Sequence, residues 1–378
     1  MLPRSTPLLK WAGGKTEELP VIASCMPGGI GKLVEPFVGG GAVWLSAQAR
    51  TYSVNDRSTD LVDLYRSIRD AEPALRDVLV EFSVLWQAVD DAAVEQSYLD
   101  SLARRCAVEG AGAIDHAGAV RFLSHCRGTG MGASLETALV TTLADKGRQM
   151  SRLAGRGAVL TEKDAASIAE TALKAAVYTA ARECYNKSSR ASGSAGERAR
   201  RAGLFWIMRQ YCYGGMFRTN AAGDFNVPYG GISYNSKNPE ALIARLSDPA
   251  LTARLRNTRI QNGDFEEFLD AEAPEPDDLV FLDPPYDGPF STYDGNAFGR
   301  EDHLRLASWL RGRCRSRWLM VIGRTDFIAE TYDLPGTHVA GFDRDYRVSF
   351  MSRNDRRARH LVIANYPLER PGAAARAA

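Results

Sequence analysis

The segment LVEPFVGGGAVWL (residues 33–45) decides the predicted fold of this chain. A short apolar run, LVEPFV, meets three consecutive glycines, and a second apolar run, AVWLSAQA (42–49), follows them. This order of strand, glycine turn and helix is typical of the first unit of a doubly wound α/β sheet. The glycines allow a tight turn and a close approach of the backbone to a ligand. A nucleotide-like cofactor is one interpretation, and a purely structural turn is the other.

The segments around this unit extend the same pattern. Residues 51–54 (TYSV) predict a second strand that ends at Asn55 and Asp56, and apolar residues at helical spacing follow in 60–69. An aspartate at this strand end can accept hydrogen bonds from a ribose diol, or it can cap the next helix. Later strands are predicted at 260–263, 279–282, 318–322 and 360–364.

Asp283-Pro284-Pro285-Tyr286 follows the apolar run LVFL directly. The two prolines fix the backbone and remove two N–H donors. Asp283 and the Pro284 carbonyl can therefore accept hydrogen bonds from an amino group whose lone pair attacks a methyl sulfonium. Tyr286 offers a ring that can stack on an extruded base. Asp-Pro-Pro also occurs in ordinary turns, but its combination with the upstream glycine unit favours a catalytic motif.

A weaker motif lies near the N-terminus, where Trp11, Gly13, Gly14 and Lys15 belong to the segment KWAGGK (10–15). An aromatic ring, two glycines and a lysine can together clamp a ligand that carries a carboxylate.

The composition is that of a soluble globular protein, with 378 residues, 45% hydrophobic and 25% charged. No run approaches the roughly 18 apolar residues of a membrane helix, and the N-terminal segment has no apolar core of a secretory signal. The net charge of +1 means that any nucleic-acid binding must come from local patches, such as the basic runs at 198–201 and 353–359. For either run, a solvated face is the simpler interpretation.

The six cysteines form no CxxC pair and have no histidine cluster beside them. This spacing argues against a zinc site or a disulfide framework, and it fits a reducing cytoplasm.

Taken in order, the motifs resemble those of the DNA adenine N6-methyltransferases of the Dam type. KWAGGK resembles the family's N-terminal cofactor motif, LVEPFVGGGAVWL its glycine motif and VND (54–56) its acidic ribose motif. CYGGMFRTNAAGDFNVPYG (212–230) resembles its target-recognition hairpin, NGDF (262–265) the motif beside the cofactor's adenine, and FLDPPY (281–286) its catalytic motif. NY (365–366) matches a typical ending after the last strand. The resemblance covers roughly residues 1–70 and 176–366, in the order of the alpha class of amino-methyltransferases.

The resemblance implies an α/β, Rossmann-like sheet that binds S-adenosylmethionine and transfers a methyl group to N6 of a flipped adenine in double-stranded DNA. It implies the catalytic residues Asp283, Pro284, Pro285 and Tyr286. It implies cofactor contacts from Trp11, Gly13, Gly14, Lys15, Glu35, Phe37, Gly39, Gly41, Asp56, Asp264, Phe265 and Asp283. Glu35, Phe37 and Gly39 are expected on the methionine side, and Asp264 and Phe265 on the adenine side. DNA contacts are expected from Tyr213, Met216, Arg218, Asn226 and Pro228. No metal is expected, because the leaving group is already a cationic sulfur.

The same resemblance suggests how the chain is divided. We expect a methyltransferase domain in two parts (1–84 and 257–368), a mostly helical insertion (85–175), a target-recognition domain (176–256) and a disordered tail (369–378). Within the third part, residues 186–203 are polar and rich in glycine and serine, which predicts a loop or connector, and a helix, a turn at Gly214-Gly215 and a hairpin follow. A monomer in the cytoplasm of a bacterium or a bacteriophage host is implied, and a partner restriction endonuclease is left open.

Three features depart from the family's pattern. Gly214 stands where the family has asparagine, His360 stands where it commonly has glutamate, and the 85–175 segment is longer than the usual connector.

Other functions remain open at this point. An N4-cytosine or RNA amino-methyltransferase would use the same chemistry, although aspartate before Pro-Pro-Tyr favours adenine and the FNVPYG hairpin favours duplex DNA. A catalytically silent DNA-binding protein is disfavoured by the intact DPPY motif. A Rossmann oxidoreductase is disfavoured because residues 39–44 lack the final glycine or alanine of GxGxxG.

Overall fold

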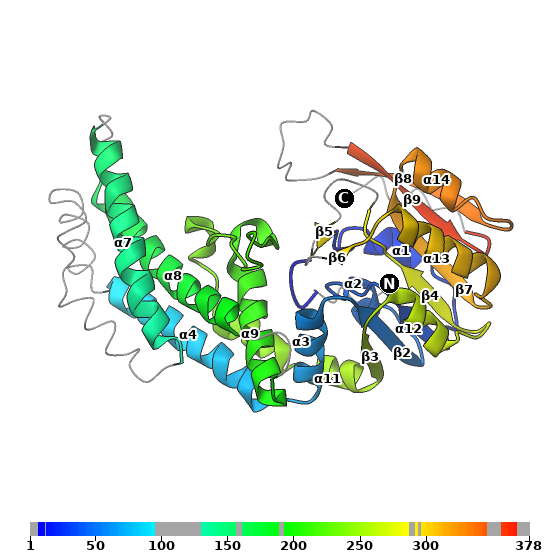
Figure 1. Cartoon of the computed structure of the whole chain (residues 1–378), viewed down its shortest axis with the longest axis horizontal. Helices are drawn as coiled ribbons and strands as arrows, with labels where there is room; N and C mark the ends of the chain where they lie inside the picture. Colours follow the sequence, from blue (N-terminus) through cyan, green and yellow to red (C-terminus); the bar gives the residue numbers. More distant parts are fainter. Residues whose placement is uncertain are drawn as a thin grey trace. The chain divides into compact units, whose positions relative to one another are not determined.

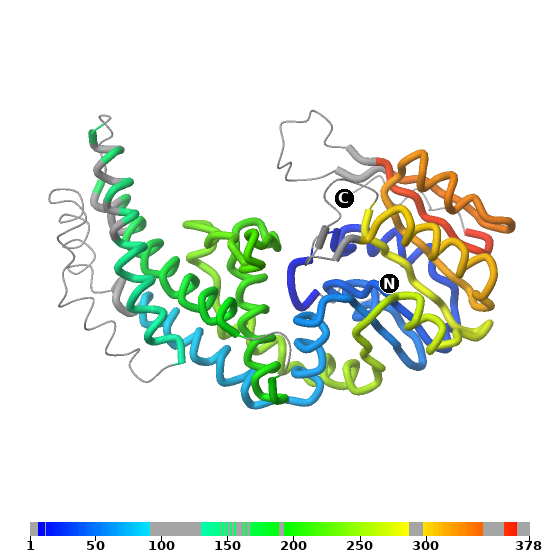
Figure 2. Tube along the Cα trace, viewed as in Figure 1, coloured from blue at the N-terminus to red at the C-terminus, as the bar shows by residue number. Residues whose placement is uncertain are grey.

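The computed structural model describes residues 7–11, 13–94, 130–155, 161–188, 193–286, 292–293, 296–345 and 357–368. The chain forms two compact units: unit 1 comprises residues 1–66 and 249–378, and unit 2 comprises residues 67–248. Figure 1 labels most of the helices and strands, and Figure 2 shows how the blue N-terminal trace and the yellow to red C-terminal trace together make up unit 1. In the described part of the chain, no helix has both the length and the apolar character that crossing a bilayer requires.

Unit 1 is built on a seven-stranded sheet with the order β3-β2-β1-β4-β7-β9-β8. The strands are β1 (Lys32–Glu35), β2 (Thr51–Asp56), β3 (Thr258–Asn262), β4 (Leu279–Leu282), β7 (Arg317–Gly323), β8 (His338–Asp345) and β9 (Arg357–Ala364). The first five strands in this order are parallel, whereas β9 runs antiparallel to both of its neighbours. This mostly parallel sheet confirms the expected Rossmann-like α/β fold.

The order of the strands shows where unit 2 is inserted in the sequence of unit 1. β3 pairs with β2, although the chain passes through all of unit 2 between them. The N-terminal part of the chain therefore supplies β1 and β2, and the part after residue 248 supplies the rest of the sheet.

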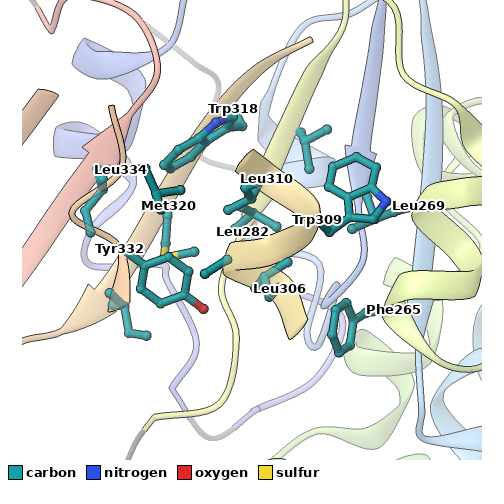
Figure 3. Packing of buried hydrophobic residues seen from close by; sticks show 14 of the residues in the cluster. Phe265, Leu269, Leu282, Leu306, Trp309, Leu310, Trp318, Met320, Tyr332 and Leu334 are labelled. Atoms are coloured by element: carbon teal, nitrogen blue, oxygen red, sulfur yellow. The ribbon is translucent and has the colours of Figure 1, made fainter. Parts of the chain in front are cut away.

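Helices cover the sheet of unit 1. They are α1 (Leu19–Cys25), α2 (Ala42–Ser46), α3 (Thr59–Arg69), α11 (Pro249–Arg256), α12 (Phe265–Glu272), α13 (Arg300–Gly312) and α14 (Asp326–Thr331), and a small ribbon is formed by β5 (Thr292–Tyr293) and β6 (Asn296–Ala297). Figure 3 shows the core on one face, where Leu282 and Met320 of the sheet meet Leu306 and Leu310 of α13. The alternate strand residues, Leu33, Phe281, Leu319 and Val321, are also buried, so apolar side chains on both faces of the central strands are covered.

Unit 2 is mostly helical. It contains α4 (Pro73–Val94), α7 (Gly132–Gly155), α8 (Glu162–Lys187), α9 (Ala195–Tyr211), α10 (Pro239–Leu246) and the 3₁₀ turns η2 (Tyr213–Gly215) and η3 (Ile232–Tyr234). The described parts of the expected 85–175 insertion are helical, whereas residues 95–129 and 156–160 lie outside the described residues. The expected tail, 369–378, lies outside them as well.

The predicted hairpin is present after α9. Antiparallel bridges join Cys212 to Tyr229 and Thr219 to Phe225. Gly223 turns the chain with a φ of +86°, a left-handed conformation that glycine adopts without a Cβ clash.

The prediction of a loop over 186–203 is wrong for most of that segment. Its first two residues complete α8, and α9 already begins at Ala195. The helix starts there because Ser194 and Glu197 form a capping box, in which each side chain accepts a hydrogen bond from the other residue's backbone N–H. The glycine and serine content of the segment favours a loop prediction, and for this reason the start of the helix was not predicted.

Candidate functional site

Four carboxylates lie at the same edge of the sheet in unit 1. Glu35 is the last residue of β1, Asp56 is the last of β2, and Asp283 follows β4 directly. Asp264 comes two residues after β3. Because these four strands are parallel neighbours, their carboxyl ends meet at one edge, which is where ligands bind in open α/β sheets.

The glycine turn after β1 is held by hydrogen bonds from two sides. The Gly39 N–H donates to Asp56 Oδ2 over 3.0 Å, and the Tyr65 hydroxyl donates to the Gly39 carbonyl over 2.5 Å. Gly39 and Gly41 have φ values of +48° and +75°. A Cβ at Gly39 would lie 2.7 Å from Cδ1 of Trp11, so the indole packs directly on the turn. Only glycine provides both this backbone conformation and this close approach.

Lys15 connects the N-terminal motif to the Asp-Pro-Pro-Tyr motif. Its side chain is only 2% exposed, and Nζ lies 2.6 Å from Asp283 Oδ1, 3.0 Å from the Tyr286 hydroxyl and 3.0 Å from the Gly13 carbonyl oxygen. Burial alone would lower the pKa of this ammonium, but the charges of Asp283, Tyr286 and Glu18 outweigh it and raise the pKa above its usual value. Lys15 is therefore a permanent cation that fixes the Asp283 carboxylate at the end of β4.

Glu35 is a buried carboxyl group without a hydrogen-bond partner for Oε1 among the described residues. Burial raises its pKa well above the usual value, and the nearby charge of Asp283 adds to the effect, whereas Arg254 opposes it. A buried acceptor of this kind needs a donor to be satisfied. The α-ammonium of a methionine-like ligand is such a donor, so the residues present fit a cofactor that carries S-adenosylmethionine's amino-acid group.

Aromatic and ionic contacts surround the segment NGDF. Phe37, Phe265 and Phe298 form a cluster with ring centroids 5.5–5.7 Å apart. Asp264 caps α12 by accepting from Glu266 N–H, and Arg305 Nη2 lies 2.7 Å from Asp264 Oδ1. Burial would raise the pKa of Asp264, but these hydrogen bonds outweigh it and lower the pKa. Phe265 is only 1% exposed, so the half-buried Phe37 offers more of its ring to a ligand.

The structure thus brings the sequence-predicted residues Trp11, Lys15, Glu35, Gly39, Asp56 and Asp283 to one edge of one sheet. Pro284 is buried beside them, and Pro285 and Tyr286 are half-buried. Gly13 has a φ of +74°, and the Gly14 N–H closes a turn onto the Trp11 carbonyl.

Sequence reasoning missed the roles of two residues that support this edge, Tyr65 and Asn55. Tyr65 lies in the segment 60–69, for which the sequence predicts only a helix. Asn55 donates through Nδ2 to the carbonyls of Pro36 and Gly263, so it links the ends of β1 and β3. No local spacing in the sequence indicates these hydrogen bonds, because the accepting carbonyls of Gly39, Pro36 and Gly263 belong to other segments of the fold.

The residues predicted to contact DNA lie on the hairpin of unit 2. Tyr213 is 49% exposed, Arg218 and Pro228 are also exposed, and Met216 and Asn226 are half-buried. Arg218 Nε donates to Asn226 Oδ1 over 3.0 Å, which orients the guanidinium. Gly214 has a φ of +63°, a region that asparagine also tolerates, so glycine in place of the family's asparagine keeps the backbone turn.

The basic run at 198–201 is largely structural. Arg201 is buried, its Nη1 donates to the carbonyls of Tyr185 and Ser188, and its guanidinium lies over the Tyr185 ring. Arg200 pairs with Glu81. The run is therefore neither a simple solvated face nor a continuous basic patch. Much of the other run, 353–359, lies outside the described residues.

Comparisons with known proteins show which sequences this chain is similar to. The family model for D12 class N6 adenine-specific DNA methyltransferases matches residues 11–97 and 161–341. The chain is 36% identical over 168 residues to the type II methyltransferase M.CviBI of Paramecium bursaria Chlorella virus NC1A, a match covering 44% of this chain and 61% of the viral protein. It is 25% identical over 322 residues to M.MjaIII of Methanocaldococcus jannaschii, covering 81% and 79% of the two chains. It is 25% identical over 341 residues to the DNA adenine methylase of Escherichia coli strain K12, covering 88% and 85%.

Proposed function

Because this chain belongs to the D12 class of N6 adenine-specific DNA methyltransferases, we propose that it uses S-adenosylmethionine to methylate an adenine flipped out of a specific site in duplex DNA. The observation that carries the proposal is the Lys15–Asp283 ion pair, 2.6 Å long, at the sheet edge that also holds the glycine turn and the buried Glu35. Unit 1 therefore contains both the residues expected to bind the methyl donor and the residues expected to accept hydrogen bonds from the target amino group.

The bound cofactor would supply a methyl group activated on a cationic sulfur. Glu35 would bind its ammonium group, and Asp56 its ribose diol. Phe37 and Gly39 would lie with Glu35 on its methionine side, and Asp264 and Phe265 on its adenine side. The backbone around the cofactor would be shaped by Trp11, Gly13, Gly14 and Gly41. Lys15 would act mainly by orienting Asp283.

The acceptors at the end of β4 would direct the target amino group. Asp283 and the Pro284 carbonyl would accept its two hydrogens, so that the nitrogen lone pair points at the methyl carbon. Pro285 has no N–H to compete for the same acceptors. Tyr286 would stack on the extruded base and offset part of the few kcal/mol that flipping costs. Positioning and fixed charges would supply most of the acceleration.

Unit 2 would bind the DNA through its hairpin, with Tyr213, Met216, Arg218, Asn226 and Pro228 facing the duplex. The chain would act as a monomer in the cytoplasm of a bacterium or bacteriophage host, with or without a partner restriction endonuclease.

The direct test is to express the chain in a methylation-free host and to map modified bases by single-molecule sequencing. We expect N6-methyladenine in one short motif, with mass spectrometry of the nucleosides confirming its identity. An unmodified genome in the presence of soluble, cofactor-binding protein would reject the proposal.

Glu35→Gln is expected to stabilise the free protein and to weaken cofactor binding. The pKa of Glu35 is raised in the folded state above the ordinary value of 4.5, so folding stability falls as the pH rises above that value and towards the folded pKa. Glutamine does not ionise, so the advantage of the variant in unfolding free energy should grow with pH within that window and vanish below it. Thermal unfolding between about pH 5 and pH 8 would measure this.

Calorimetric titration with S-adenosylmethionine completes the test of Glu35. A neutral amide replaces a charged partner of the ammonium, so affinity should fall by about 10-fold or more. If the difference in unfolding free energy between wild type and Glu35→Gln does not change with pH, or if the affinity for S-adenosylmethionine is unchanged, Glu35 is not the residue that binds the ammonium group.

Arg218→Ala is expected to weaken DNA binding and to reduce its dependence on salt. If Arg218 neutralises one phosphate, the slope of log affinity against log salt should fall by about 0.9. Arg245→Ala is the matched control, because Arg245 is also an exposed arginine of unit 2 but lies in α10, outside the hairpin. Binding isotherms at several salt concentrations measure both variants, and equal slopes would count against a phosphate contact at Arg218. If Arg218 reads a base instead, the loss would be confined to the cognate sequence.

A further inference from the structure

Two buried ionisable residues contact the site from the side of α1 and β9. Glu18 is the N-cap residue of α1, and its side chain is 2% exposed. His360 lies in β9, opposite Gly323 of β7, and its side chain is fully buried. Neither residue has a role in the mechanism above. Burying a carboxylate and an imidazole is costly unless they interact with polar partners, so their position requires an explanation.

The two residues contact each other and the catalytic motif. Glu18 Oε1 lies 3.2 Å from His360 Nδ1, and Glu18 Oε2 lies 3.8 Å from Lys15 Nζ. The His360 ring packs edge-on against Tyr286, with centroids 5.6 Å apart and planes at 87°. Four residues therefore form a closed ring of contacts: Glu18, His360, Tyr286 and Lys15. Asp283 lies outside the ring and contacts it through Lys15.

The contacts of Lys15 show what Glu18 contributes. An ammonium has three N–H donors, and Gly13, Tyr286 and Asp283 lie within 3.0 Å of Nζ. Glu18, at 3.8 Å, therefore acts on Lys15 by charge rather than through a short hydrogen bond. It also raises the pKa of Lys15, together with Asp283 and Tyr286.

The contacts of His360 show what the imidazole contributes. Its ring lies between Tyr286 and Phe342 of β8, whose centroid is 5.5 Å away. The adjacent Gly323 has no side chain, and a Cβ there would come within 3.7 Å of the Tyr286 ring. Tyr286 thus rests on the β7–β9 strand pair, and the His360 ring packs against it in a T-shaped arrangement.

We propose that Glu18 and His360 are a pair of positioning residues, which hold Lys15 and Tyr286 so that Asp283 and the stacking ring meet the target adenine correctly. This rests on the proposed function, since it assigns the pair to the same methyl transfer. Neither residue touches the reacting atoms. Misplacement of reacting groups by a fraction of an ångström to 1 Å can reduce rates by about 10- to 100-fold, so the pair should affect the chemical step.

The test uses the full-length protein and two variants that remove the polar contact differently. Glu18→Gln keeps the size of the side chain and removes its charge. His360→Phe keeps a ring beside Tyr286 and removes the nitrogen that faces Glu18. Glu17→Gln is the matched control, because Glu17 is the exposed neighbour of Glu18. Single-turnover methylation at saturating DNA and cofactor measures the chemical step, while separate titrations give both affinities and thermal unfolding gives stability.

We expect Glu18→Gln and His360→Phe to slow the single-turnover rate by about 10-fold or more, with both affinities within about threefold of wild type. The double variant should be no slower than the slower single variant, because the two residues act as one unit. Glu17→Gln should match wild type. Rates within twofold of wild type, additive losses in the double variant, or losses that only follow a lower unfolding temperature would overturn the pairing and leave the proposed function intact. A wild-type protein that methylates no adenine would overturn both.

Discussion

Asp283→Ala is expected to reduce methyl transfer by about 10²- to 10³-fold or more, the range seen when one preorganised polar contact to a transition state is removed. Asp283 is proposed to accept a hydrogen bond from the target amino group, and alanine has no acceptor to orient the lone pair. Single-turnover methylation of a cognate duplex with labelled S-adenosylmethionine measures this loss. Activity within about tenfold of wild type would reject Asp283 as the amino acceptor.

Asp283→Ala is also expected to lower the folding stability of the protein. Asp283 is the closest charged partner of the buried Lys15, and removing one partner of a buried ion pair can cost about 3–5 kcal/mol. A loss of activity could then reflect unfolding. The double variant Asp283→Ala/Lys15→Met separates the two effects, because it removes the stranded ammonium as well. It should recover much of the unfolding temperature lost in Asp283→Ala, yet it should remain inactive.

Much of unit 1 could be predicted from the sequence because its central strands are covered on both faces. β4 matches the apolar run LVFL residue for residue, since Pro284 and Pro285 end the strand. β8 was missed because it is an edge strand whose residues are only partly covered, as the 57% exposure of Val339 shows. A strand of that kind has no continuous apolar signal.

The candidate site was predictable where a motif carries the chemistry within a few residues. DPPY and the glycine turn are such motifs, and both lie at strand ends as the α/β pattern indicates. Tyr65 contacts the glycine turn, Glu18 contacts His360 and Arg305 contacts Asp264 only when distant segments meet in the fold. His360 was recognised as a departure from the family's pattern, but its contact with Glu18 and Tyr286 has no signal in the sequence.

Gly39→Ala is the second variant with a large expected effect, and it should weaken cofactor binding strongly. Two penalties combine at this position. Alanine at a φ of +48° costs about 1–2 kcal/mol, and its Cβ would lie 2.7 Å from the Trp11 ring, which must move. Trp11 and the turn are both proposed cofactor contacts, so we expect the affinity for S-adenosylmethionine to fall by about 100-fold, as when a good hydrogen-bonded site loses about 3 kcal/mol.

Gly29→Ala separates backbone strain from the clash. Gly29 has a φ of +63°, it is exposed, and a Cβ there would meet nothing within 4 Å. This control should lower the unfolding free energy by about 1–2 kcal/mol and leave cofactor affinity unchanged. If the displaced indole causes the loss at Gly39, then Gly39→Ala should add little in a Trp11→Ala background. A further full loss of affinity in that background would mean that the turn itself, held by Asp56 and Tyr65, carries the binding energy, and that Trp11 only packs on it.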